Sequence, residues 1–449
     1  MAPRLFGTDG MRGRAGQWPL DPPTVRRLGA AIVRVLDEAS GPARLLIGRD
    51  TRESGTWIER ELAHGARLAG ASVTAAGVLP TPAVAYLARH SDVALGAVIS
   101  ASHNPFEDNG IKVFAGTGQK FTEQRERQVE AIVADTSWTL AAGEAPEVPV
   151  EDLTGAYREH LRDVLPSAGR LTGARVVVDC AHGATTSVAP RVFADLGFDV
   201  DLIGASPDGR NINLGCGSTH PEPMAARVVE RGAVAGVAFD GDGDRAILAD
   251  EHGRLVDGDA VMLMCAKQMK AEGRLRGDAL VATVMSNIGL ELALREAGID
   301  MIRTAVGDKY VMEEMLKRDL PLGGEQSGHV IFSEYLFTGD GIATSLHVLR
   351  TMAATGRELA DLASEMTAYP QVLLNLRVQQ RVDLRTIPAV AAVLDDVESR
   401  LAGHGRLLVR YSGTEPLLRV MLEGRDQDEI RGWGQEIIDA VRQHVGAAV

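Results

Sequence analysis

The sequence predicts an α/β fold, because apolar runs of strand length alternate with segments of helical spacing along most of the chain. Residues 45–48 and 72–78 read as buried strands, and residues 55–69 between them have the apolar spacing of a helix. The alternation resumes at residues 175–179 with a new strand. Hydrophobic residues make up 45% of the 449 residues, an ordinary fraction for a globular protein, so we do not expect disorder.

Changes in this pattern divide the chain into four domains. Residues 137–150 mix Gly, Ala, Glu and Pro and have the composition of a linker. A long helix begins after residues 257–259 and starts a third α/β block. A small α+β domain then follows, with strands at 372–378, 407–409 and 418–422 and helices at 384–402 and 427–446. We therefore predict domains at residues 1–150, 151–256, 257–368 and 369–449.

The charge and the cysteines limit the class of partner. A net charge of −14 without a basic stripe argues against nucleic acid, so an anionic ligand must be attracted by local Arg, Lys or metal. No apolar run approaches the roughly eighteen residues needed to span a membrane, and the N-terminus lacks an apolar signal core. Cys180, Cys216 and Cys265 are odd in number and widely spaced, which fits a reducing compartment. We expect a cytoplasmic protein without nucleic-acid or membrane partners.

A zinc site can be imagined from Cys180, His182, Cys216 and His220. The Cys-x-His spacing is unlike the usual structural zinc patterns. Cys180 follows a predicted strand and is more simply explained as a small buried residue. We therefore do not favour zinc.

One loop places a serine at the end of a buried strand. An apolar run ends at Ile99, a small polar turn follows, and a second short strand begins near Ile111. Ser102 then lies at the mouth of a sheet, with His103 beside it and Lys112 returning nearby. A serine in this place can carry a phosphoryl group if its surroundings lower the cost of negative charge. A polar turn that caps a helix is the alternative for an isolated Ser-His pair.

Asp240, Asp242 and Asp244 alternate with glycines directly after another buried-strand pattern. These carboxylates repel one another unless a cation neutralises them, and the glycines let the backbone curl so that they converge. Hard oxygen ligands suit Mg²⁺, which leaves coordination positions for a substrate phosphate. An EF-hand loop fits the spacing with Glu251, but Arg245 stands where its turn glycine belongs, and the flanks are strand-like. A divalent-metal loop is favoured over an EF-hand and over a solvated acidic turn.

Two further glycine-containing loops carry groups that a phosphorylated sugar needs. Residues 323–329 offer a carboxylate, an amide, a hydroxyl and an imidazole, which suit sugar hydroxyls. Residues 410–419 offer backbone N–H groups, hydroxyls and two guanidiniums, which suit a phosphate dianion. Either loop alone is weak support, because polar glycine-rich turns are common.

Together the four loops resemble those of the α-D-phosphohexomutase superfamily, and the resemblance spans nearly the whole chain. Within that superfamily the sequence resembles the bacterial phosphoglucosamine mutases. The segments that carry this second resemblance are 6–13, 207–213, 216–222, 283–287 and 338–341, together with Gln326 in the sugar loop. Lys309 departs from the pattern, where arginine is expected, and this leaves the role of that position open.

The resemblance implies three successive similar α/β domains with mixed sheets plus a smaller C-terminal α+β domain, arranged around a central cleft. In chain order the domains would supply the phosphoserine loop, the metal site, the sugar loop and the phosphate loop. The implied reaction is an isomerisation by intramolecular phosphotransfer. Glucosamine 6-phosphate and glucosamine 1-phosphate interconvert through a phosphoserine and glucosamine 1,6-bisphosphate, supplying UDP-N-acetylglucosamine synthesis and cell-wall precursors. The implied cofactors are one Mg²⁺ per chain and glucosamine 1,6-bisphosphate, or a similar compound, as phosphorylating primer.

The resemblance also assigns roles to single residues. Ser102 carries the phosphate and, through a phosphoserine oxygen, completes the metal site formed by Asp240, Asp242 and Asp244. Glu325 and Ser327 hold sugar hydroxyls. The residues that would bind the non-reacting phosphate are Arg410, Ser412, Gly413, Thr414 and Arg419. Arg245 stabilises charge and Arg12 cradles the transferred group, while the general base and acid stay open among His103, Lys112 and His329.

Three other functions stay open at this point. A metal-dependent phosphatase using Ser102 would release inorganic phosphate, which a mutase must prevent. A non-catalytic sugar-phosphate-binding protein is disfavoured by the intact serine and aspartates. A phosphomannomutase/phosphoglucomutase of the same superfamily is the nearest alternative, because the residues alone do not show a preference for a 2-amino over a 2-hydroxy sugar. The expected partner is a small-molecule sugar phosphate, and we allow for a homodimer.

Overall fold

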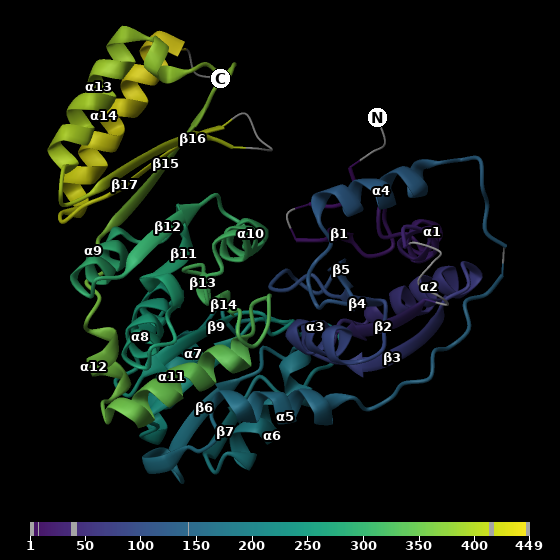
Figure 1. Cartoon of the computed structure of the whole chain (residues 1–449). Helices are drawn as coiled ribbons and strands as arrows, with labels where there is room; N and C mark the ends of the chain where they lie inside the picture. The colour runs from purple at the N-terminus through teal and green to yellow at the C-terminus, as the bar shows by residue number, and fades with distance from the viewer. Residues whose placement is uncertain (1–3, 8, 37–42, 142, 413–416, 446–449) are drawn as a thin grey trace. The chain divides into compact units, whose positions relative to one another are not determined.

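The computed structural model describes residues 4–7, 9–36, 43–141, 143–412 and 417–445 (Figure 1). The chain divides into two compact units. The first comprises Met1–Met285 and Ala297–Glu365, and the second comprises Ser286–Glu296 and Met366–Val449.

The first unit contains three mixed sheets and the helices that cover them. Its strands are β1 (Met11–Arg14), β2 (Arg44–Arg49), β3 (Ser72–Val78), β4 (Leu95–Ile99), β5 (Asp108–Ala115), β6 (Arg175–Asp179), β7 (Asp199–Ile203), β8 (Ala235–Phe239), β9 (Ala246–Asp250), β10 (Leu255–Val256), β11 (Ala279–Thr283), β12 (Asp300–Thr304), β13 (Leu322–Gly324) and β14 (Val330–Phe332). Its α-helices are α1 (Pro22–Arg34), α2 (Gly55–Leu68), α3 (Thr81–His90), α4 (Glu123–Ala134), α5 (Thr154–Val164), α6 (Ala189–Asp195), α7 (Glu222–Arg231), α8 (Gly258–Ala271), α10 (Asp308–Arg318), α11 (Gly341–Thr355) and α12 (Leu359–Ala363).

The three sheets repeat one topology. Their shared strand orders are β5-β4-β2-β3, β9-β8-β6-β7 and β14-β13-β11-β12. Among the four shared strands of each sheet, the first three in chain order run parallel, and the fourth is antiparallel to the third. The parallel strands are joined through helices, whereas a short loop can join the antiparallel pair. The repeated mixed sheets confirm the predicted α/β architecture of three similar domains.

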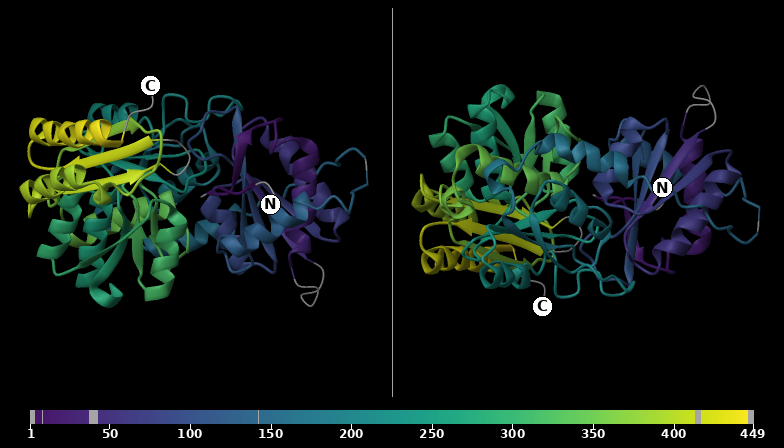
Figure 2. Two further views of the ribbon diagram at one scale, coloured as in Figure 1. Left: turned by 90° about the horizontal axis from the view of Figure 1, so that it is seen from above. Right: turned by 90° about the horizontal axis from the view of Figure 1, so that it is seen from below.

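The first sheet shows how the helices reach its two faces (Figure 2). Apolar residues of α1, α2 and α4 form one core with the strands, including Leu28, Leu62 and Val129. Helices α1 and α2 cross closely, because a Cβ at Gly65 would lie 1.8 Å from the Arg26 carbonyl oxygen. Helix α3 packs on the other side of the strands, so this domain has an α/β/α layering.

The functional loops occupy one equivalent position in the three sheets. Residues 100–107 join β4 to β5, residues 240–245 join β8 to β9, and residues 325–329 join β13 to β14. Each loop therefore connects the third strand of its sheet to the antiparallel fourth strand. The repetition places three chemically different loops at the same point of the fold.

The second unit contains a three-stranded antiparallel sheet in the order β15-β17-β16. Its elements are α9 (Ile288–Glu296), β15 (Gln371–Arg377), α13 (Pro388–Leu401), β16 (Arg406–Tyr411), β17 (Leu417–Glu423) and α14 (Gln427–Val445). Helices α13 and α14 bury Val397, Ile437 and Val441 against the strands. This smaller unit agrees with the predicted α+β domain.

The two largest differences from the predicted element boundaries lie at the starts of β5 and α13. Strand β5 begins at Asp108 instead of near Ile111, because residues 108–111 pair with β1. The helix expected from residue 384 begins at Pro388. Ile387 is extended there, as the residue before a proline prefers, and only a 3-10 turn precedes it. Among the described residues, none of the helices is long and apolar enough to cross a bilayer.

Candidate active site

Ser102 lies between β4 and β5 in a conformation that non-glycine residues rarely adopt. Its φ is +54°, in the left-handed region, and the residue is 1% exposed. The Ser102 hydroxyl donates to Asp240 Oδ2 at 2.5 Å and lies 3.1 Å from His103 Nδ1. The predicted nucleophile thus faces the predicted metal loop, 138 residues away in sequence.

A buried arginine holds the serine loop in this conformation. Arg52 donates from Nη2 to the carbonyl oxygens of Ser102 at 3.0 Å and Asn104 at 2.8 Å. Its Nε donates to Asp50 Oδ2 at 2.8 Å, and both side chains are fully buried. Asn213 Nδ2 donates to the same Ser102 carbonyl at 3.0 Å. Sequence reasoning missed the roles of Arg52 and Asp50; an Asp-x-Arg pattern directly after a buried strand was the available signal.

The three aspartates of the second loop converge as predicted. One carboxylate oxygen from each lies within 4.8 Å of the others, and all three residues are buried. Asp242 Oδ1 is buried without a hydrogen-bond partner among the described residues, although Asp242 Oδ2 accepts from Thr81 Oγ1 at 2.6 Å. An orphaned oxygen in a buried carboxylate cluster fits a divalent cation with oxygen ligands. The flanking strands β8 and β9 exclude the EF-hand, whose loop lies between helices.

Lys112 partly neutralises this acidic cluster. Its ammonium lies 2.9 Å from Asp242 Oδ2, 2.9 Å from Asp244 Oδ2 and 3.0 Å from Asp9 Oδ2. Burial alone would lower the pKa of Lys112, but the three carboxylates raise it well above its usual value. Burial and the neighbouring aspartates raise the pKa of Asp240, so one ammonium does not balance the cluster.

An open cleft of about 310 Å³ lies beside these residues. It is lined by Asp9, Arg12, His103, Asp244, Arg245, Val306, Gly307, Asp308, Glu325 and His329. Five of these residues are the predicted Arg12, His103, Arg245, Glu325 and His329. Burial lowers the pKa of His103 to about 4, with Arg245 and Arg12 acting in the same direction, so its ring is neutral near pH 7.

The sugar loop packs against the metal loop. Ala246, the first residue of β9, donates its N–H to the Gly328 carbonyl at 3.1 Å. Glu325 lies in the cleft, where its Oε1 accepts the Gly307 N–H at 3.0 Å. Ser327 is exposed, and the Gln326 amide donates to Asp257 Oδ2 at 3.1 Å. The loop therefore presents its carboxylate to the cleft and uses its amide to contact the start of α8.

His329 lies deeper, between Asp244 of the metal loop and Asp308 of the third domain. Its Nδ1 is 3.5 Å from Asp244 Oδ1, and its Nε2 is 3.7 Å from Asp308 Oδ2. Burial alone would lower the pKa of His329, but the Asp244 carboxylate raises it. The structure thus brings Ser102, the aspartates, Lys112 and His329 together around the metal loop.

Charged residues that sequence reasoning did not assign complete the cleft. Lys120 forms ion pairs with Asp9 and Asp308, which lie in the first and third domains. Lys309 lies 3.7 Å from Glu123 and 3.9 Å from Glu126, both on α4. These pairs join the first domain to the third, and the unusual Lys309 takes part. The glycines flanking Asp9 and Asp308 were the sequence signal for these loops.

The second unit carries the predicted phosphate loop. Arg410 of β16 and Arg419 of β17 are cross-strand partners, so their side chains leave the same face of the sheet. Ser412 is buried, and its carbonyl accepts from Arg381 Nη2 at 2.6 Å. The predicted residues Gly413 and Thr414 lie outside the described residues. Two guanidiniums on one face are an arrangement suited to a phosphate.

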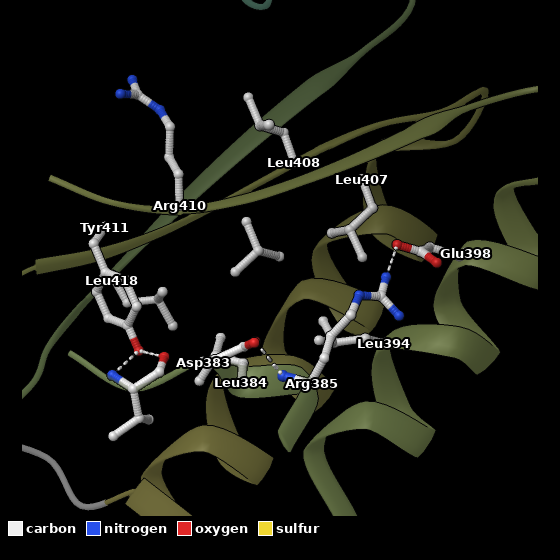
Figure 3. Close-up of a pocket in the computed structure, with 12 residues that line it drawn as sticks. Asp383, Leu384, Arg385, Leu394, Glu398, Leu407, Leu408, Arg410, Tyr411 and Leu418 are labelled. Atoms are coloured by element: carbon white, nitrogen blue, oxygen red, sulfur yellow. Dashed lines mark hydrogen bonds and ion pairs between the residues drawn. The ribbon is translucent and has the colours of Figure 1, made fainter. Parts of the chain in front are cut away.

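A separate pocket of about 390 Å³ lies on the other face of this sheet (Figure 3). It is lined largely by apolar residues, including Leu394, Leu407 and Leu418, and the Arg385–Glu398 ion pair lies along it. Figure 3 shows the Arg410 side chain pointing away from these residues. Arg410 therefore borders the pocket without entering its apolar part, and Arg419 is not among the residues that line it.

Among the described residues, the cysteines belong to no group of three or more side chains close enough to hold a metal ion. Cys180, Cys216 and Cys265 are all buried and unpaired, and burial raises the pKa of each thiol to about 12. Within the part of the chain that the structure describes, the three aspartates are the one group of three or more ligands close enough to hold an ion.

Four family models cover almost the whole chain. They describe the domains of phosphoglucomutase/phosphomannomutase: α/β/α domains I, II and III match residues 3–139, 156–253 and 257–369, and the C-terminal domain matches residues 373–440. The chain belongs to the phosphoglucomutase/phosphomannomutase family. The predicted resemblance to the phosphohexomutases is confirmed.

Curated relatives match over the full length. The phosphoglucosamine mutase of Geotalea daltonii is 46% identical over 449 residues, with 99% of each chain covered. That of Solibacter usitatus is 47% identical and covers 99% of this chain and 100% of its own. That of Desulforudis audaxviator is 48% identical, with 98% of each chain covered. The predicted similarity to the bacterial phosphoglucosamine mutases is therefore supported along the entire chain.

Solved structures share the fold at lower identity. A phosphoglucomutase/phosphomannomutase family protein of Burkholderia thailandensis superposes with a TM-score of 0.79 at 22% identity, covering 99% of this chain and 98% of its own. The N-acetylphosphoglucosamine mutase of Aspergillus fumigatus, solved with GlcNAc-6P and magnesium, superposes with a TM-score of 0.66 at 18% identity, covering 98% of this chain and 95% of its own. At these identities the likeness concerns the fold alone.

Proposed function

We propose that this chain interconverts glucosamine 6-phosphate and glucosamine 1-phosphate, and so supplies amino-sugar nucleotide synthesis. The observation that carries the proposal is the Ser102 hydroxyl directed at Asp240, beside a cleft that is lined by Arg12, Arg245 and Glu325. The full-length identity of 46–48% to phosphoglucosamine mutases supports the choice of sugar. The reaction class is intramolecular phosphotransfer.

In the forward direction, the sugar 1-hydroxyl attacks the phosphorus carried on Ser102. A bond from the sugar oxygen to phosphorus forms as the bond from Ser102 Oγ breaks, which gives glucosamine 1,6-bisphosphate. The hydroxyl proton passes to a base, and His103, Lys112 and His329 are the candidates. The bisphosphate then turns within the site and Ser102 Oγ attacks the phosphorus of the 6-phosphate. The bond from that phosphorus to the sugar O6 breaks, O6 takes up a proton, and glucosamine 1-phosphate leaves with Ser102 phosphorylated again.

The residues around Ser102 favour this transfer chiefly through position and charge. Arg245 and Arg12 line the cleft, where they can neutralise the three equatorial phosphoryl oxygens. Lys112 is fixed by Asp242 and Asp244. The Arg52 contacts keep the Ser102 backbone in its left-handed conformation, so the hydroxyl is oriented before substrate binds.

A divalent ion fits the aspartates, and we propose one Mg²⁺ per chain held by Asp240, Asp242, Asp244 and a phosphoserine oxygen. When bound, such an ion withdraws charge from the phosphoryl oxygens and from Ser102 Oγ as it leaves. A sugar bisphosphate such as glucosamine 1,6-bisphosphate would first phosphorylate the serine.

The remaining roles follow the family pattern. Glu325 and Ser327 would bind sugar hydroxyls. The non-reacting phosphate would be held by Arg410, Ser412, Gly413, Thr414 and Arg419, and the pairing of Arg410 with Arg419 on adjacent strands supports the use of both guanidiniums. We also propose a cytoplasmic location, because the three cysteines form no disulfide. We further propose a homodimer, which light scattering would test.

The decisive experiment compares the 6-phosphates of glucosamine, glucose and mannose with a trace of sugar bisphosphate, following 1-phosphate formation by ³¹P NMR. We expect the highest kcat/KM with glucosamine 6-phosphate and no stoichiometric release of inorganic phosphate. Net release of phosphate would identify a phosphatase. A preference for mannose 6-phosphate would identify a phosphomannomutase. Binding without turnover would leave a non-catalytic protein.

A further inference from the structure

Asp340 is a buried carboxylate behind the cleft that the proposed reaction does not use. It is 4% exposed and precedes α11, where its Oδ1 accepts the Ala343 N–H at 2.9 Å as a helix cap. Its Oδ2 accepts the hydroxyl of Tyr157, a fully buried residue of α5, at 2.7 Å. Asp340 therefore ties the start of one helix to a second helix from the preceding domain.

The two residues beside Asp340 touch the proposed site through their backbone. Gly339 donates its N–H to His329 Nε2 at 3.0 Å. Gly341 donates its N–H to the carbonyl of Gly243, within the metal loop, at 2.9 Å. A Cβ at residue 339 would lie 2.6 Å from both the Asp244 carbonyl oxygen and the His329 ring. The turn is thus in direct contact with the metal loop and the imidazole, and only glycine fits there.

The Gly339 contact also determines which His329 nitrogen carries the proton in the neutral ring. A backbone N–H can only donate, so Nε2 must accept and the ring proton lies on Nδ1. Nδ1 is the nitrogen 3.5 Å from Asp244 Oδ1. If the turn moved, His329 would lose this constraint on both its tautomer and its orientation.

The Tyr157 ring, whose hydroxyl contacts Asp340, is packed among other aromatic rings. It belongs to an aromatic group with Tyr86 of α3 and His160 of α5, with centroids 6.1 and 6.4 Å away. Tyr86 and His160 stack with centroids 4.3 Å apart. The hydroxyl is therefore held in place by packing between the first and second domains, and it can fix the Asp340 carboxylate.

We infer that Tyr157 and Asp340 are positioning residues for the proposed reaction: through the turn at residues 338–341 they set the His329 tautomer and the path of the metal loop. The inference rests on the proposed function for its kinetic consequence. Its structural consequence, the Nδ1–H form of His329, does not depend on activity.

Tyr157→Phe tests the inference with the smallest change, because it removes one hydroxyl and keeps the ring. We expect kcat to fall about 10- to 100-fold, the range typical of residues that orient a site's ligands, with KM changed less than about threefold. Asp340→Ala should lower kcat further, and Asp340→Asn, which retains a capping oxygen, should recover part of the loss. In ¹⁵N-histidine NMR spectra the Nδ1–H signature of His329, assigned with His329→Asn, should weaken in Tyr157→Phe.

Two matched variants separate positioning from general stability. Tyr86→Phe removes a hydroxyl from the same aromatic group without a hydrogen bond to Asp340, and Asp21→Ala removes a helix cap from α1. Both should keep wild-type kcat and the His329 signature. An unchanged tautomer in Tyr157→Phe and Asp340→Ala, or an equal loss of kcat in the two controls, would overturn the inference. A wild-type protein with the Nδ1–H signature but no mutase turnover would instead overturn the proposed function.

Discussion

The serine loop and the metal loop occupy the same position in two similar sheets, yet their backbones are held in different ways. The serine loop contains no glycine, and Ser102 adopts its left-handed φ because Arg52 and Asn213 hold its carbonyl. In the metal loop the left-handed position belongs to Gly243, which adopts it without strain. The conformation of the serine loop therefore depends on distant side chains, whereas that of the metal loop depends mainly on its own residues.

The two loops differ in whether their conformation depends on their own residues or on residues elsewhere in the chain. The metal loop can be interpreted locally, because three aspartates and a glycine turn suffice to converge. The serine loop cannot, because its geometry depends on a buried ion pair from another strand–helix connection. The sugar loop is intermediate: Gly328 supplies the left-handed turn at φ +89°, but the loop also bonds to β9.

Removing the nucleophile should have the largest effect. Ser102→Ala deletes the oxygen that carries the phosphoryl group in the proposed reaction, so kcat should fall by more than about a thousandfold. Ser137→Ala, at an exposed linker position, is the control and should behave as wild type. Peptide mass spectrometry should find phosphate on residue 102 in the wild type. Full turnover by Ser102→Ala would refute the assignment.

Changing the metal loop should separate activity from stability. Asp240→Asn removes one charge from a buried cluster that Lys112 only partly neutralises, so the metal-free protein should unfold at the same or a higher temperature. Its Mg²⁺ affinity, measured by titration calorimetry, should fall by more than about a hundredfold, beyond the usual loss from an outer partner. Asp199→Asn, exposed on β7, should alter neither quantity. Wild-type turnover in excess EDTA would contradict this account.

The contrast between the loops also explains what could be predicted from sequence. The pattern of apolar residues predicted the strands around Ser102 and Asp240. The spacing of the three aspartates predicted the metal loop. The contact between Ser102 and Asp240 joins two domains, so it followed from the family resemblance and not from local pattern. Arg52 and Asp340 escaped prediction, because their roles consist of tertiary hydrogen bonds to backbone groups and a distant tyrosine. The start of α13 was misplaced because the effect of Pro388 was overlooked.

The dependence of the serine loop on Arg52 can be tested by a change that keeps the charge. Arg52→Lys retains the ion pair with Asp50 but loses the planar fork that reaches two carbonyls, so we expect kcat to fall about 10- to 100-fold. Arg26→Lys, which alters an arginine paired with Glu61 between α1 and α2, is the matched control. Equal kinetics for both variants would show that the clamp does not position Ser102.

Changes in the sugar loop should affect the preference between the two sugar phosphates more than the turnover rate. Glu325→Gln keeps the shape but replaces a charged acceptor with a neutral one, and charge-assisted hydrogen bonds exceed neutral ones by about 1 kcal/mol. The ratio of kcat/KM for glucosamine 6-phosphate over glucose 6-phosphate should fall by about fivefold. Ser327→Ala, in the same loop, should change both sugars alike. If Glu325→Gln lowered kcat/KM equally for both sugar phosphates, the proposed mutase activity would be unaffected, but this explanation of its specificity would be wrong.

The last expected effect concerns the pH dependence of stability at the turn of residues 338–341, which contacts both the metal loop and His329. Burial raises the pKa of Asp340 from the usual 3.8 to about 6, outweighing the hydrogen bonds from Ala343 and Tyr157. The folded protein then binds more protons at this group than the unfolded chain, so its stabilising contribution is complete below about pH 4 and is lost as the pH rises through about 6. Asp340→Asn lacks this titration. The unfolding free energy of the variant minus that of the wild type should therefore increase by up to about 3 kcal/mol between pH 4 and pH 7. Denaturant unfolding at several pH values measures the difference, and a constant offset would mean that Asp340 does not titrate in this range.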